Sequence, residues 1–189
     1  MNHPSAYISQ KNCPISFVSN MGQSVEISIH PPSNYIRTNC QRILPSWDNE
    51  KSFWIVIVLQ QSKCELAHIT KEVEEEKERL REKFMRFGCD IAFNLRDAPH
   101  SKSYLTELID PRTGYPLFSL PGQVPHDDTA AVKALLGYPV IHNQCRLLVH
   151  PEWGMAVYPS ILISQAPPVI IEWYTKAIAP IHGWNDLNR

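Results

Sequence analysis

The segment around Cys145 contains the residue types best suited to bind a soft metal. Arg146 follows Cys145 directly, and His142, His150 and Trp153 stand close to it in the sequence. A guanidinium beside a thiol favours the thiolate, which is both a nucleophile and a soft metal ligand. Cysteine is also among the most frequently buried residue types, so Cys145 fits equally well as a small hydrophobic residue entering a strand. His150 is more typical of a turn residue that hydrogen-bonds the backbone than of a metal ligand.

Two acidic segments offer further ligand types. His126, Asp127 and Asp128 are consecutive, but adjacent side chains rarely converge on one ion, and the segment stands where a helix needs an N-terminal cap. The run 72–78 is rich in glutamate, and carboxylates in the first turns of a helix are favoured by its dipole. We therefore interpret the first segment as a cap and the second as a helix start, and predict no metal site in either.

The remaining cysteines indicate a reducing environment. The chain has five cysteines, an odd number, and no CxxC spacing, so neither a disulfide framework nor a zinc cage is indicated. We interpret Cys40, Cys64 and Cys89 as small buried residues. The N-terminus has neither the pattern of a secretory signal nor that of a mitochondrial leader. We therefore expect a cytoplasmic protein with free thiols.

Composition excludes several classes of function. With 189 residues the chain is long enough for one core, and we expect a single domain over residues 25–189 after a flexible tail, 1–24. The net charge is -1 and basic residues are scattered, which argues against a nucleic-acid partner. Apolar runs fall far short of the roughly 20 residues that cross a membrane. No glycine-rich phosphate loop, GxSxG or HExxH motif is present, so we predict no catalytic residues.

The first half of the expected domain contains two strands and a long helix. Residues 25–29 alternate between apolar and polar, as in a half-buried strand, and Pro31-Pro32 ends it, leaving a loop to about residue 51. Residues 53–59 are continuously apolar, as in a central strand buried on both faces. Residues 71–95 have helical periodicity. On this helix we expect outer pairs of Glu75 with Arg79 and of Glu82 with Arg86, and an inner face of Leu80, Phe84, Phe87, Ile91 and Leu95.

The second half contains a turn, two more strands and two helices. Residues 110–114 predict a turn, and an extended loop follows to about residue 125. A short helix over 129–136 is closed by Gly137. Residues 145–149 and 155–163 are expected to be strands joined by the turn 150–154, before a last helix at 169–179. All four strands are expected to join one sheet, which gives an α+β sandwich with a mainly antiparallel sheet.

The order of these features resembles the methylmalonic aciduria and homocystinuria type D protein family, whose members traffic cobalamin. The similar segments occur in order between residues 53 and 165, and each is weak alone. They are the charged run 73–84, Ile109-Asp110-Pro111 with Thr113-Gly114, Leu136-Gly137-Tyr138-Pro139-Val140, Cys145, His150-Pro151-Glu152-Trp153-Gly154, and Ser160-Ile161. Relative to animal members, we expect a compact form without the N-terminal extension.

The resemblance implies a fold like that of nitroreductases and flavin reductases, without use of flavin. It implies cobalamin bound through a partner, the type C protein that processes incoming cobalamin, and delivery towards methionine synthase or methylmalonyl-CoA mutase. It implies a cobalt ligand at Cys145, with Asp110, Gly114, His150, Trp153 and Gly154 as motif residues of the structure or the partner surface. Some relatives have two adjacent cysteines here; if their ligand is the first, it aligns with Gln144.

Three functions remain open at this point. An adapter predicts no substrate pocket and an interaction surface near Cys145 and the turn 150–154. A flavin- or thiol-dependent cobalamin reductase or dealkylase follows only from the implied fold, which is a weak basis for function. A protein-interaction module without cobalamin binding is the third. We favour the non-enzymatic adapter.

Overall fold

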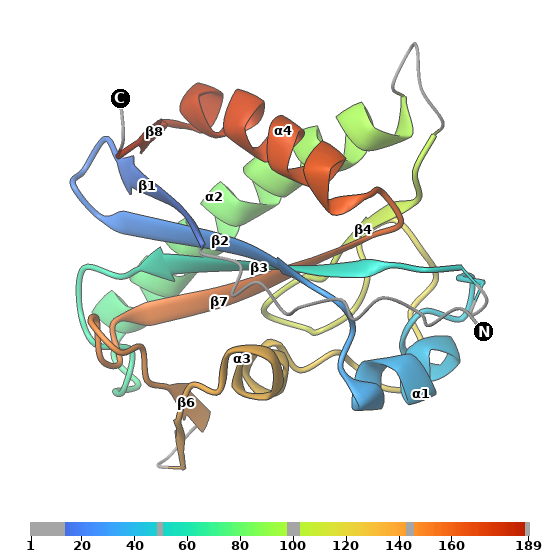
Figure 1. Cartoon of the computed structure of the whole chain (residues 1–189). Coiled ribbons are helices and arrows are strands. Elements are labelled where there is room, and N and C mark those ends of the chain that lie inside the picture. The colour runs from blue at the N-terminus through green and yellow to red at the C-terminus, as the bar shows by residue number, and fades with distance from the viewer. Residues whose placement is uncertain (1–13, 49–50, 98–102, 143–145, 188–189) are drawn as a thin grey trace, which may run out of the picture.

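The computed structural model describes residues 14–48, 51–97, 103–142 and 146–187. Within them, a six-stranded sheet has the strand order β4-β7-β3-β2-β1-β8, and every neighbouring pair is antiparallel (Figure 1). A separate two-stranded sheet pairs β5 with β6. The strands are β1 (Ile15–Ser19), β2 (Ser24–His30), β3 (Trp54–Gln61), β4 (Thr106–Leu108), β5 (Val140–His142), β6 (Arg146–Leu148), β7 (Val157–Ser164) and β8 (Trp184–Asp186).

Helices cover both faces of the large sheet. One face carries α2 (Lys71–Arg96) and α4 (Pro168–Ile178), with a short 3-10 helix, η1 (Ala179–His182), after α4 (Figure 1). The other face carries α1 (Asn34–Ile43) and α3 (Asp128–Leu136). Each face has its own cluster of buried apolar residues. The molecule is therefore three-layered. Its α+β class and its mainly antiparallel sheet are as the sequence predicted.

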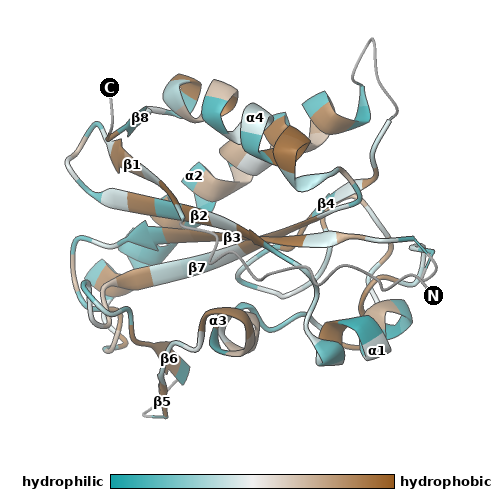
Figure 2. Cartoon of the chain, viewed as in Figure 1, coloured by the Kyte–Doolittle hydropathy of each residue, from teal (hydrophilic) through white to brown (hydrophobic). Residues whose placement is uncertain are grey.

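Strand β3 lies at the centre and contributes to both cores. Val56 and Val58 pack in the cluster under α2 and α4, whereas Ile55 and Ile57 pack in the cluster over α1 and α3. All four side chains are buried. Figure 2 shows hydrophobic stretches along β3 and β7. The prediction of a central strand buried on both faces is confirmed.

The long helix α2 begins and packs as its sequence predicts. Thr70 is the N-cap, and its hydroxyl accepts a hydrogen bond from the backbone N–H of Val73. The five apolar residues of the predicted inner face are all buried, and each fully buried Leu or Phe stabilises the fold by roughly 1.5–3 kcal/mol.

One of the two predicted ion pairs on α2 is wrong. Glu82 does pair with Arg86, at 3.5 Å. Glu75 instead pairs with Lys71. Arg79 pairs with Glu76, whose side chain is buried.

Three further expectations are corrected by the structure. Residues 15–19 were expected in the flexible tail but form β1, which pairs with β2 and β8. The loop expected after Pro31-Pro32 contains α1, because Ser33 caps a helix whose Ile36, Cys40 and Ile43 face the core. Within the described residues, strand β6 does not join the large sheet, and its ladder partner is β5.

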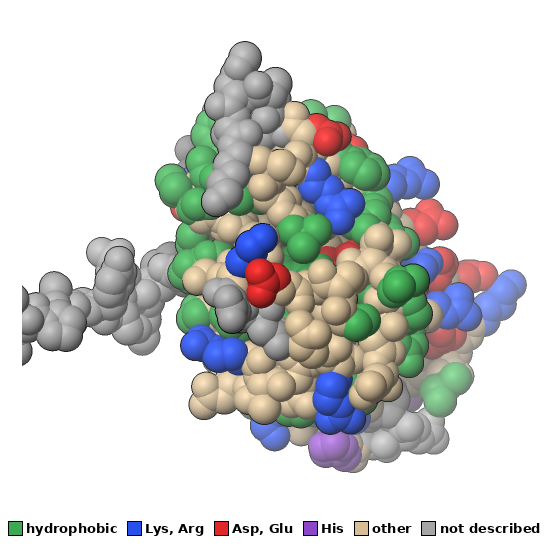
Figure 3. Space-filling view, turned by 90° about the vertical axis from the view of Figure 1, so that its right-hand side faces the viewer, with side chains coloured by type: hydrophobic (Ala, Val, Ile, Leu, Met, Phe, Trp, Pro, Cys, Tyr) green, Lys and Arg blue, Asp and Glu red, His purple; other side chains and the backbone are tan. Residues whose placement is uncertain are grey.

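The described surface has no dominant charge on the face that Figure 3 shows. Among the described side chains of that face, basic and acidic groups are interspersed with apolar and uncharged ones. No helix in the described part of the chain has the length and hydrophobicity needed to span a bilayer.

Candidate functional site

The main predicted site residue, Cys145, lies outside the described residues, as does Gln144, but its surroundings in the sequence are described. Strands β5 and β6 run antiparallel, with His142 opposite Arg146. Cys145 belongs to the short connection between these strands. Leu147 and Leu148, which follow in β6, are buried, with Leu148 in the core shared by α1 and α3. The strand after Cys145 is therefore fixed to the body of the molecule.

Arg146 is held by the first turn of α3. Its guanidinium forms an ion pair with Asp127, and the two side chains are 44% and 42% exposed. The other carboxylate oxygen of Asp127 accepts a hydrogen bond of 2.8 Å from the backbone N–H of Ala130 and caps the helix. The predicted capping role of Asp127 is confirmed. The positive charge of Arg146, the residue after Cys145 in the sequence, is thus partly neutralised by the Asp127 carboxylate.

The turn at residues 150–154 is built around a buried histidine. Nδ1 of His150 accepts hydrogen bonds from the backbone N–H groups of Glu152 and Trp153, both at 3.2 Å. Nε2 faces a carboxylate oxygen of Glu26 at 3.3 Å, so it carries the proton. The ring stacks on Trp153 with 3.8 Å between centroids. Gly154 closes the turn with a φ of 57°. His150 is confirmed as a residue that binds backbone, and both ring nitrogens are occupied.

A cavity of about 780 Å³ lies beside this hairpin. It is lined by the first turns of α2, the turn after β4, the start of α3, β6 and the start of β7. Its apolar wall includes Leu66, Leu148, Met155 and Val157. The volume lies within the roughly 300–1,000 Å³ typical of small-molecule sites. The adapter hypothesis did not predict a pocket of this size.

The turn at residues 110–114 ties α2 to the start of α3. The Arg81 guanidinium donates two hydrogen bonds to the carboxylate of Asp110, at 2.7 and 3.0 Å, and these lower the pKa of Asp110. Gly114 has a φ of 73°, and its carbonyl accepts a hydrogen bond of 2.7 Å from the N–H of His126. A Cβ at Gly114 would collide with the backbone of His126. Gly114 therefore lines the cavity directly, and Asp110 fixes the turn to which Gly114 belongs.

A buried polar group lies in that wall. Nδ1 of His126 and a carboxylate oxygen of Asp128 are 2.8 Å apart, and both side chains are at least nine-tenths buried. Within the described structure, Nε2 of His126 and Oδ2 of Asp128 have no hydrogen-bond partner. Burial raises the pKa of Asp128, because the bond to His126 opposes it only in part. Leaving such atoms unpaired costs roughly 1–3 kcal/mol each.

Tyr158 adds a proton donor to the same wall. Burial, together with the nearby carboxylate of Asp128, raises the pKa of Tyr158 well above its usual value. The phenol therefore stays protonated at neutral pH. Among the described residues, no hydrogen bond of this hydroxyl is found.

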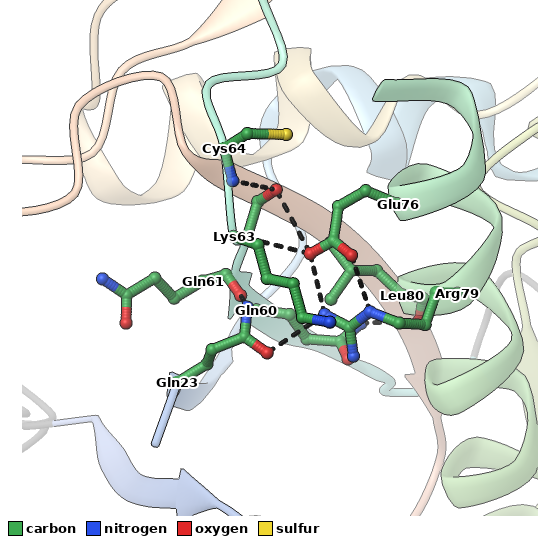
Figure 4. Close-up of polar contacts among 9 residues, drawn as sticks. Gln23, Gln60, Gln61, Lys63, Cys64, Glu76, Arg79 and Leu80 are labelled. Carbon is green, nitrogen blue, oxygen red and sulfur yellow. Dashed lines mark hydrogen bonds and ion pairs between the residues drawn. The ribbon is translucent and has the colours of Figure 1, made fainter. Parts of the chain in front are cut away.

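The first turns of α2, which form another wall, are fixed by a buried carboxylate (Figure 4). Glu76 accepts hydrogen bonds from the Arg79 guanidinium at 2.6 and 2.7 Å and from the backbone N–H of Lys63 at 2.9 Å. Arg79 also donates to Gln23 at 3.1 Å. Burial opposes ionisation of Glu76, but these hydrogen bonds outweigh it and lower its pKa. The network joins α2 to the segments after β3 and β1.

The described cysteines do not form a reactive centre. Cys40 is buried, and burial raises its pKa and that of Cys89. Cys64 lies next to the Glu76 network (Figure 4). Within the described residues, no three His, Cys, Asp or Glu side chains are arranged to hold a metal ion.

Sequence reasoning missed the cavity and two of its polar residues, Arg81 and Tyr158. Arg81 meets Asp110 from a position 29 residues away, so no local pattern reveals the pair. Tyr158 alternates with apolar residues in β7 like any half-buried strand residue. The only usable signal was the cluster His126-Asp127-Asp128, which we had interpreted as a cap.

Comparison with known proteins places the chain in a family. The family model described as methylmalonic aciduria and homocystinuria type D protein matches residues 4–172. A human protein named cobalamin trafficking protein CblD is 28% identical over 145 residues, which cover 76% of this chain and 47% of the relative. Its rat counterpart is 27% identical over 143 residues, covering 75% of this chain and 47% of the relative. The chain thus spans about half the length of these relatives. Because the family model covers most of its residues, the chain belongs to the methylmalonic aciduria and homocystinuria type D protein family.

Proposed function

We propose that this protein is a cobalamin-trafficking adapter, which receives processed cobalamin from a partner and directs it towards cobalamin-dependent enzymes. The observation that carries the proposal is membership of a family whose matched relatives are named cobalamin trafficking proteins. The partner is a cobalamin-processing protein of the type C kind. The acceptors are methionine synthase or methylmalonyl-CoA mutase. The adapter acts in the cytoplasm, without catalytic residues and without flavin, and its fold is related to the nitroreductases.

Cys145 is the residue that contacts the cargo. Its sulfur coordinates the cobalt of a corrinoid that the partner holds, because a metal cation favours the deprotonated form of a thiol ligand at neutral pH. Two features of the described structure support this role. Buried Leu147 and Leu148 anchor the strand that follows Cys145, and the pair of Arg146 with Asp127 fixes the next side chain.

The surface around this thiol serves as the partner interface. The turn 150–154 follows β6 closely in the chain and is stiffened by the stack of His150 on Trp153. Asp110 and Gly114 hold the start of α3, which carries Asp127. These motif residues position the hairpin and leave the chemistry to Cys145.

The cavity of about 780 Å³ favours a second candidate, a flavin- or thiol-dependent cobalamin reductase or dealkylase. Such an enzyme needs a site for its cofactor or second substrate. An interaction module without cobalamin binding would use neither the cavity nor the thiol.

One experiment separates the three functions. The tagged chain is isolated from native lysate, and corrinoid and flavin in the eluate are quantified by absorbance. The adapter predicts stoichiometric corrinoid with a co-purified partner, no flavin, and loss of the corrinoid when the partner is removed. Bound flavin would contradict the adapter and favour the enzyme. A partner without corrinoid would favour the interaction module.

A further inference from the structure

The cavity presents polar groups that no described residue satisfies. Nε2 of His126 and Oδ2 of Asp128 are buried in its wall and lack partners among the described residues, and Tyr158, whose hydroxyl keeps its proton at neutral pH, also lines the cavity. The two unpaired atoms are covered by other protein atoms, whereas the Tyr158 side chain is only half-buried. A protonated hydroxyl in the wall of a cavity can donate a hydrogen bond to a ligand that accepts one.

The charges around the cavity point to an uncharged ligand. The lysines and arginines that line it each form an ion pair with a carboxylate: Lys71 with Glu75, Lys77 with Glu74, Arg81 with Asp110, Arg112 with Glu78, and Arg146 with Asp127. A phosphate or a carboxylate would have to compete with these partners. A neutral group that hydrogen-bonds at both ends, such as a primary carboxamide, meets no such competition.

The lining of the cavity also includes a residue adjacent in sequence to the proposed cobalt ligand. Arg146 lines the cavity and directly follows Cys145 in the sequence. A corrin ring carries amide side chains on both of its faces and around its rim. Whichever face meets the thiolate therefore presents amides towards the chain. We propose that the cavity beside Arg146 binds peripheral carboxamide side chains of the corrinoid, with Tyr158 as the principal donor. This inference rests on the proposed function.

Dicyanocobinamide is the probe that tests the cavity independently of Cys145. It keeps the peripheral amides, and cyanide fills both axial positions of its cobalt, so a thiolate cannot bind. Titrated into the ¹⁵N-labelled chain, it should shift the backbone amide resonances of Thr113, Asp128 and Tyr158 in a saturable way. Dicyanocobyrinic acid, which has carboxylates in place of the amides, should bind more weakly.

Two variants and one control assign the binding to the cavity. Tyr158→Phe should weaken dicyanocobinamide binding by about 2- to 10-fold, the effect of one neutral hydrogen bond. Thr129→Trp should reduce binding further by filling the cavity from the first turn of α3, and it covers the case in which Tyr158→Phe disturbs folding. Tyr174→Phe, on α4 across the sheet, should bind like the parent.

Several results would overturn the inference. These are absence of shifts at the cavity residues, equal binding by the carboxylate analogue, equal binding by Tyr158→Phe and Tyr174→Phe, or displacement of the probe by flavin mononucleotide. Because the probe cannot form a cobalt–sulfur bond, none of these results would bear on the thiolate role of Cys145. Failure of cobalt–thiolate formation would conversely leave the cavity result intact.

Discussion

Glu76 shows how a residue that appears solvent-exposed in the sequence can anchor the structure. It stands in a glutamate-rich helix start, yet its side chain is only 7% exposed and its oxygens meet Arg79, Ser62 and the N–H of Lys63. Glu76→Gln should lower the free energy of unfolding by about 1.5–3 kcal/mol, the range for hydrogen bonds to a charged group. Urea denaturation at neutral pH measures this loss.

The same residue predicts a pH dependence. The pKa of Glu76 is lower in the folded protein than its unfolded value of about 4.3. Its contribution is therefore complete above that unfolded value and is lost as the pH falls through the lowered folded pKa. The difference in stability between the parent and Glu76→Gln should thus shrink as the pH falls below about 4.3. Glu75→Gln, at an exposed position, should stay within about 0.5 kcal/mol of the parent; an equal effect of both variants would refute the anchor.

For single residues, the local role of a side chain was easier to predict than its partner in a tertiary contact. The capping role of Asp127 and the backbone-binding role of His150 followed from local patterns and are confirmed. The ion-pair partners of Arg79 and Arg81 did not follow from local patterns. Helical spacing places several carboxylates within reach of one arginine and does not select among them. Cys145 lies outside the described residues, so its role remains a proposal.

The elements that were predicted are those with long, regular patterns. In α2 the burial of Phe84 is complete, whereas Phe93 on the same helix is 48% exposed. Phe84→Asp should abolish folding, because it places a charge in the core under the sheet. Phe93→Asp should leave a cooperative unfolding transition. Circular dichroism with thermal melting tests both, and a stable Phe84→Asp variant would show that the helix packs differently.

The turn after β4 offers a matched pair of glycines. Gly114 and Gly22 have φ values of 73° and 77°, but only at Gly114 would a Cβ meet neighbouring backbone. Gly22→Ala should therefore cost only the strain of a left-handed backbone, about 1 kcal/mol. Gly114→Ala should cost clearly more and should disturb the resonances of His126 and Asp128. Equal melting temperatures of the two variants would contradict the contact between this turn and the start of α3.

The elements that were missed are short or depend on distant partners. β4 and β8 have three residues each, too few for a periodic pattern. β1 is set by pairing with β2 and β8, and residues 184–186 are the far end of the chain. β6 was assigned to the large sheet because its sequence reads as a strand. Pairing is a tertiary property, and its only ladder partner among the described residues is β5.

At the scale of the whole molecule, the cavity is the feature that no sequence pattern predicted. It forms where segments from residues 66 to 159 meet, and each segment has an ordinary local role. The fold thus places this cavity beside Arg146, the residue that follows Cys145 in the sequence. An adapter with one ligand and one side cavity still depends on its partner for most of its affinity.

That dependence is measurable. Isothermal titration of the chain alone with cobalamin should give little heat, because the partner supplies the enclosing pocket. The corrinoid-loaded partner should bind with clear heat. A stoichiometric, submicromolar complex of cobalamin with the chain alone would mean that the protein encloses its own site and acts as a carrier or an enzyme.

The most direct test of the account is the visible absorption spectrum of cobalamin when the chain is added to a cobalamin-loaded partner of the type C kind. The parent should produce the spectrum of a cobalt–thiolate bond. Cys145→Ser should bind the partner and unfold at the same temperature as the parent but should not produce that spectrum, whereas Cys64→Ser, the control, should. A cobalt–thiolate spectrum that persists in Cys145→Ser would contradict the account.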